Sequence, residues 1–142
     1  MKFLSTIIFL CFATSAFSQT GKMFKGTINN TNKVTLYLQN TDQGTHADRI
    51  LGVYKYDNQQ QYILLNGYLN DKGNIVLVEQ ASPNFSGVFF GTLKANEIKG
   101  KWISADQTKT YPFQLQEIKA NASQKELFDK AIVNKANEFS NY

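Results

Sequence analysis

The chain has 142 residues, of which 42% are hydrophobic, 13% aromatic and 18% charged. This length is typical of one domain, and the composition is too apolar and too aromatic for a disordered or collagen-like chain. The formal net charge of +4 is mild, and its densest cluster is Lys99 and Lys101, so nucleic-acid binding is not expected.

Residues 1–18 have the pattern of a secretory signal peptide. Lys2 provides a basic start, Phe3–Phe12 is a short apolar run, and Ala16–Ser18 places small residues where a signal peptidase cuts. We expect cleavage before Gln19. A retained N-terminal anchor and a lipoprotein are the alternatives.

Cleavage at this site would remove Cys11, the only cysteine of the chain. The mature protein would then have no disulfide, no thiol nucleophile and no thiolate metal site. We expect an exported protein of bacterial origin, periplasmic or extracellular, with no transmembrane segment after cleavage.

From about residue 23 to residue 118, apolar residues recur at every second position, which is the period of a β-strand. Clusters of Asn, Asp, Gly and Pro separate the runs and predict short turns, so neighbouring strands should pair antiparallel. The polar segment Asn40–Arg49 is expected to be a longer loop. The expected strands are Met23–Ile28, Val34–Gln39, Leu51–Tyr56, Tyr62–Leu69, Ile75–Glu79, Phe85–Leu93, Ile98–Ile103 and Tyr111–Gln116.

Eight antiparallel strands in chain order predict a meander, and a meander that rolls up into an up-and-down barrel loses its exposed edges. We therefore predict an all-β domain over residues 19–120 that forms an eight-stranded up-and-down barrel. A sandwich of two four-stranded sheets is the alternative.

The C-terminal segment 121–142 has a helical period instead, because Phe128, Ala131 and Ile132 recur on one face. Ser123–Glu126 matches a capping box, so we expect an amphipathic helix from about residue 124 to 138 that packs on the barrel.

Three consecutive expected strands, 62–69, 75–79 and 85–93, are apolar on both faces, although a barrel wall needs only one apolar face. The simplest explanation is that the helix packs outside this patch. A subunit or partner interface and a second packed layer are the alternatives.

Few residues offer catalytic or metal chemistry. His46 is the only histidine, and with the scattered carboxylates of Asp42 and Asp48 it makes too small a ligand set, so no metal and no cofactor are expected. Glu79 ends a strand on the same face as Ile75, and we expect it to turn to water or to pair with a Lys. The alternative is that it points into the barrel as a glycosidase-type acid, but no second acid clearly shares its face.

Aromatic residues are dense between residues 54 and 113 and would fill the barrel, line a pocket or form a recognition surface. The short strands favour a filled interior. We place Tyr54, Tyr56 and Tyr68 on the outward side. The predicted binding residues are Asp42, His46, Asp48, Arg49, Tyr54, Tyr56, Tyr68, Glu79 and Trp102.

Two sets of motifs carry resemblances. Ile98–Trp102 resembles the Gly-x-Trp strand of the avidin and lipocalin barrels, although there the motif lies in the first strand. A longer series is similar to that of small exported bacterial proteins with calycin-like barrels, whose function is mostly unknown. Both resemblances imply a barrel, and neither implies a ligand or an active site. The series consists of Gly52–Tyr56, Leu65–Gly67, Ile75–Glu79, Gly87–Gly91 and Ile98–Trp102.

These observations predict an exported, non-catalytic binding protein that is a monomer or a homodimer. Its target would be a protein, such as a secreted hydrolase that it inhibits, or a small apolar or glycan ligand that it carries. The alternatives are a small carbohydrate-acting enzyme that uses Glu79 and a structural envelope protein.

Overall fold

The computed structural model describes residues 21–140, apart from the side chain of Asp42. The expected signal peptide lies outside the described residues. The described part of the chain forms β1 (Lys22–Ile28), β2 (Asn32–Asp42), β3 (Ala47–Tyr56), β4 (Ile63–Asn70), β5 (Asn74–Gln80), β6 (Gly87–Lys94), β7 (Glu97–Ser104), β8 (Thr110–Ile118) and α1 (Ala122–Phe139).

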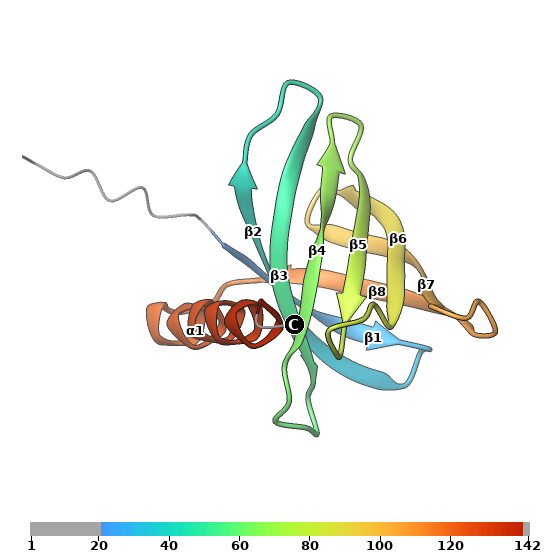
Figure 1. The fold of residues 1–142 in the computed structure, drawn as a ribbon. Helices are drawn as coiled ribbons and strands as arrows, with labels where there is room; N and C mark the ends of the chain where they lie inside the picture. Colours follow the sequence, from blue (N-terminus) through green and yellow to red (C-terminus); the bar gives the residue numbers. More distant parts are fainter. Residues whose placement is uncertain (1–20, 141–142) are drawn as a thin grey trace, which may run out of the picture.

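The strands form a closed antiparallel barrel in which each strand pairs with the next and β8 pairs back to β1 (Figure 1). The predicted eight-stranded meander with one C-terminal helix is therefore confirmed, and the sandwich alternative is wrong. Gly26 lies at the seam between β1 and β8, where a Cβ atom would come within 1.9 Å of the Gln114 carbonyl oxygen. The close approach of the two strands at this point requires a glycine.

The barrel interior holds buried side chains from all eight strands. Phe89 lies among them and makes edge-to-face contacts with Tyr54 and Phe113, with ring centroids 5.5 and 5.2 Å apart. A core of this kind is the main source of folding free energy in a chain of this length. The interior is thus filled by the protein's own side chains, as the short strands suggest.

The helix α1 packs on the outer face of β1–β4, beside the barrel (Figure 1). Its central contact is Phe128, whose ring lies 5.8 Å from that of Tyr37 and 5.2 Å from that of Tyr62. The expectation that the helix covers the patch on the three doubly apolar strands holds only for the first of them, where Tyr62 and Leu64 pack on the helix, and is wrong for β5 and β6, which contribute nothing to this cluster. The buried residues of the cluster are Met23, Tyr37, Val53, Leu64, Phe128, Ala131 and Ile132.

Polar contacts also hold the helix on the barrel. The Gln39 side-chain amide donates to the Asp129 carboxylate at 2.5 Å. Burial, together with a hydrogen bond to Asp129, raises the pKa of Tyr37 to about 12. The capping box at the start of α1 consists of Asn121 and Gln124, and not of Ser123 and Glu126 as the sequence suggests. Both pairs fit the same pattern, and the structure uses the earlier one.

The polar segment 40–49 is mostly strand, which corrects the expectation of a long loop. Asn40 still pairs with Ile50, a bulge follows, and β3 already begins at Ala47. The Asn40 side chain donates to the Asp48 carboxylate at 3.0 Å, so polar side chains here support a hairpin. The sequence is polar because the hairpin extends beyond the buried core.

Candidate functional site

The predicted binding residues lie in three separate places. Tyr54, Tyr56, Glu79 and Trp102 belong to the barrel interior and its rim, whereas Arg49 and Tyr68 are cross-strand neighbours on the outer surface. His46 and Asp48 lie at the hairpin between β2 and β3. Asp42 ends β2, and its side chain is outside the described part of the structure.

Glu79 lies near the end of β5, and its side chain is the centre of a buried hydrogen-bond network. The residue is 4% exposed. Its Oε2 accepts from the Tyr54 hydroxyl at 2.5 Å and from Trp102 Nε1 at 2.9 Å. Its Oε1 accepts from the Ser86 hydroxyl at 2.7 Å. Strands β3, β5 and β7 are thus tied together inside the barrel by a carboxylate whose two oxygens both have donors.

Tyr54 points into the barrel and is 1% exposed, so the expectation that it faces outward is wrong. Burial, and next the Glu79 carboxylate, raise the pKa of Tyr54 far above its ordinary value. The hydroxyl therefore stays protonated and donates to Glu79. The ring of Tyr56 lies 5.7 Å from that of Tyr54, on the inner side of the rim and partly buried, which also differs from the outward position expected.

Trp102 completes this network from β7. Its ring stacks on that of Tyr111, with centroids 5.6 Å apart and planes 7° from parallel. Sequence reasoning missed Ser86, because no sequence spacing connects residues on segments that meet only when the barrel closes. The network organises the interior. The favoured expectation that Glu79 turns to water or pairs with a Lys is wrong, because its carboxylate points inward and is bonded to Tyr54, Ser86 and Trp102.

A second site candidate is the outer wall, which we define as the outward side chains of Tyr68, Val76, Val78, Val88, Phe90 and Ile103. Tyr68 pairs with Val76, and Val76 with Phe90, so the three form one row across β4, β5 and β6. Tyr68 is 55% exposed and Phe90 is 61% exposed. Val78, Val88 and Ile103 form the next row and are partly buried.

Basic side chains flank the outer wall. Arg49 on β3 pairs with Tyr68, and Lys101 on β7 pairs with Phe90, so the aromatic row has a cation at each end. Both cations are exposed. The outward positions of β4, β5 and β6 hold no Asp or Glu. The one charged residue at these positions is Lys94. The nearest carboxylate on β7, that of Glu97, is 2.9 Å from Lys99 and is thereby paired.

The hairpin end of β2 and β3 carries the only described histidine. Nδ1 of His46 lies 3.8 Å from the Asp71 carboxylate, and both side chains are largely exposed. The Asp48 carboxylate accepts a hydrogen bond from the Asn40 side chain. Within residues 21–140 there is no group of three or more His, Cys, Asp or Glu side chains that could hold a metal ion.

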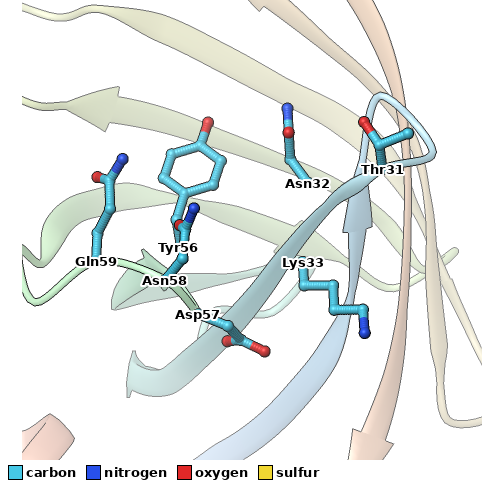
Figure 2. Close-up of a pocket in the computed structure, with 7 residues that line it drawn as sticks. All are labelled: Thr31, Asn32, Lys33, Tyr56, Asp57, Asn58 and Gln59. Carbon is cyan, nitrogen blue, oxygen red and sulfur yellow. The ribbon is translucent and has the colours of Figure 1, made fainter.

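A pocket of about 590 Å³ lies at the rim of the barrel, between the β1–β2 turn and the loop after β3 (Figure 2). We call it the rim pocket. Tyr56 connects it to the Glu79 network, because the ring of Tyr56 packs against Tyr54. The residues that line it are Thr31, Asn32, Lys33, Tyr56, Asp57, Asn58 and Gln59.

Comparison of the chain with protein-family models, with curated proteins and with solved structures finds no significant match. Residues 21–140 contain no helix that is both long enough and apolar enough to cross a membrane. The functional interpretation therefore depends on the geometry of these surfaces alone.

Proposed function

We propose that this is an exported, non-catalytic binding protein whose outer wall binds an acidic partner protein. The observation that carries the proposal is the row in which the exposed rings of Tyr68 and Phe90 lie on either side of Val76, with Arg49 and Lys101 at the two ends. Exposed apolar patches of this kind mark interaction surfaces, and Tyr and Arg are enriched among the residues that dominate binding energy. A secreted hydrolase with an acidic surface is one partner of this class.

The charges favour an acidic partner over a second copy of the chain. A twofold contact through the outer wall would bring Arg49, Lys94 and Lys101 of the two copies together, and the wall offers no carboxylate in return. A partner that places carboxylates around an apolar centre would pair with the cations and cover the rings. The exposed Arg49 would increase the association rate and make it sensitive to salt.

The geometry of Glu79 gives little support to the enzyme alternative. Its carboxylate is almost fully buried, and both oxygens already accept hydrogen bonds from Tyr54, Trp102 and Ser86. A general acid must reach a substrate oxygen, and this side chain would first have to break a satisfied network.

The test uses the mature chain, residues 19–142, immobilised and exposed to an extract of the organism that makes it. Two wall variants, Tyr68→Ser and Phe90→Ser, are compared with Phe85→Ser. Phe85 is 55% exposed but lies in the loop before β6, outside the wall, so it is the matched control. We expect one acidic protein to be retained by the native chain and by the control, lost from both wall variants, and released by high salt.

A charge-reversal pair sharpens the result. Arg49→Glu combined with Lys101→Glu should weaken retention of the same protein and abolish its salt dependence. Equal retention by the native chain and all wall variants would refute the proposal. A homodimer of the native chain that Phe90→Ser dissociates would identify a second copy as the occupant and would also refute it.

A further inference from the structure

Five of the seven residues that line the rim pocket carry uncharged polar groups. Thr31, Asn32, Tyr56, Asn58 and Gln59 bring hydroxyls and primary amides to it, and Figure 2 shows that Asn32, Tyr56 and Gln59 point to the same side of the loop. Pockets of several hundred Å³ with a few convergent polar groups are typical of small-ligand sites.

The two charged lining residues turn away from this side. Lys33 and Asp57 extend in the opposite direction in Figure 2. The Asp57 carboxylate accepts a hydrogen bond from the Thr35 hydroxyl at 2.7 Å, on the outer face of the barrel. A charged ligand in the rim pocket would therefore find no side chain of opposite charge pointing toward it.

Three amides of the pocket have unused hydrogen-bonding capacity. The side chains of Asn32, Asn58 and Gln59 form no hydrogen bond with any other described residue. Each primary amide offers two N–H donors and a carbonyl acceptor. A purely apolar ligand would cover these groups without pairing them, at a cost in free energy for each one.

The backbone holds the two walls of the pocket in place. The Asp57 N–H donates to the Lys33 carbonyl at 2.9 Å, and the Gln59 N–H donates to the Tyr56 carbonyl at 3.0 Å. On the other wall, Asn29 and Asn30 adopt left-handed turn conformations with φ of 54° and 61°, which Asn tolerates better than most residues. The Asn29 N–H then donates to the Pro112 carbonyl at 2.8 Å, which fixes the turn to β8. The site is formed before a ligand arrives, and this lowers the entropic cost of binding.

We propose that the rim pocket binds a small uncharged saccharide. Sugar hydroxyls both donate and accept, which matches the free amides of Asn32, Asn58 and Gln59. The ring of Tyr56 is held at one edge by Tyr54 and offers an apolar surface to the C–H groups of a sugar ring. The pocket lies at the end of the barrel and shares no residue with the outer wall, so this site is independent of the proposed partner surface.

The test is titration of the ¹⁵N-labelled mature chain, followed by NMR, with glucose, galactose, N-acetylglucosamine, maltose, cellobiose and chitobiose. We expect at least one sugar to shift the side-chain amide signals of Asn32, Asn58 and Gln59 with a single dissociation constant. Asn58→Ala and Gln59→Ala, which change exposed loop side chains, should each weaken that binding about fivefold, the equivalent of one lost hydrogen bond of about 1 kcal/mol. Gln43→Ala is the matched control, because Gln43 is exposed at the opposite end of β2.

The outcomes separate the possible ligands. Absence of shifts at these three amides with every sugar would overturn the proposal. Tighter binding of uridine or of a blocked neutral dipeptide than of any sugar would overturn it as well, since a nucleoside or a peptide would then be the better match to the amides. Equal weakening by the Gln43→Ala control would show that the shifts do not report on the rim pocket.

Discussion

Two walls of the barrel carry apolar side chains on the outside, and only one of them is covered by the helix. On β1–β4, the outward Met23, Tyr37, Val53 and Leu64 are all at most 3% exposed, because α1 covers them. On β4–β6, the outward Tyr68 and Phe90 remain more than half exposed.

The contrast separates two reasons for a doubly apolar strand. The covered wall stabilises the fold, because packing against the helix removes its apolar side chains from water. The outer wall contributes much less to stability in the isolated chain, and its large exposed rings favour association. Substitutions in the covered wall should therefore lower the free energy of unfolding, whereas substitutions in the outer wall should weaken partner binding.

The largest expected effect follows from removing the ring at the centre of the covered wall. Phe128 is 6% exposed and contacts both Tyr37 and Tyr62. Phe128→Ala should lower the free energy of unfolding by about 3–5 kcal/mol in a urea titration. The neighbouring Leu127 is 61% exposed, so Leu127→Ala should change it by about 0.5 kcal/mol or less. Similar losses for both variants would mean that α1 does not pack as described.

A matched pair of aliphatic truncations compares the walls directly. Leu64 lies under the helix and is 3% exposed, so Leu64→Ala should cost about 2–5 kcal/mol. Val76→Ala, on the outer wall, should cost about 1 kcal/mol or less because Val76 is only partly buried. Equal costs, measured by the same denaturant titration, would show that something also covers the outer wall.

The covered wall should also respond to alkaline pH. The ordinary pKa of tyrosine is 10.0, and that of Tyr37 is raised to about 12, first by burial and then by Asp129. A raised pKa in the folded state favours the neutral form there, so the stabilisation is present below pH 10 and is lost as pH rises through about 12. Thermal unfolding of the Tyr37→Phe variant should lose less stability than the native chain over this interval. Parallel pH curves for the two proteins would contradict the assignment.

The smallest expected effect on stability belongs to the wall proposed to bind a partner. Phe90 is 61% exposed, so Phe90→Ser should change the free energy of unfolding by about 0.5 kcal/mol or less while removing partner binding. A large loss of stability in the isolated monomer would mean that Phe90 is a core residue, and the proposed role of the outer wall would then be wrong.

The sequence predicts the barrel well because alternation, short turns and strand number all point to the same architecture. It does not predict which outer face the helix covers. Met23, Tyr37 and Val53 share the outer faces of their strands with polar residues such as Lys25, Thr35 and Lys55 and give no local sign of a partner, whereas the doubly apolar strands near Tyr68 do. Periodicity defines a face but contains no information about which faces meet in space.

The candidate sites were predictable only in part. Glu79 lies on the same face of its strand as Ile75 and Leu77, which is the pattern of an inward residue, and Tyr68 can be placed outward. Tyr54 lies in a strand where both alternating sets of residues are partly apolar, so its direction cannot be read from the pattern. The direction of Tyr54 is settled by pairing with neighbouring strands, as is its contact with Glu79. The rim pocket depends on a turn and a loop that are far apart in sequence, so its amides show no spacing that would reveal it.

The most direct test of the two-wall description is hydroxyl-radical footprinting of isolated residues 19–142, read residue by residue by mass spectrometry. Tyr68 and Phe90 should be oxidised rapidly, and Tyr37 and Phe128 should be protected, at every protein concentration used. Protection of Tyr68 and Phe90 to the same degree as Tyr37 would contradict the description, because the outer wall would then already be covered.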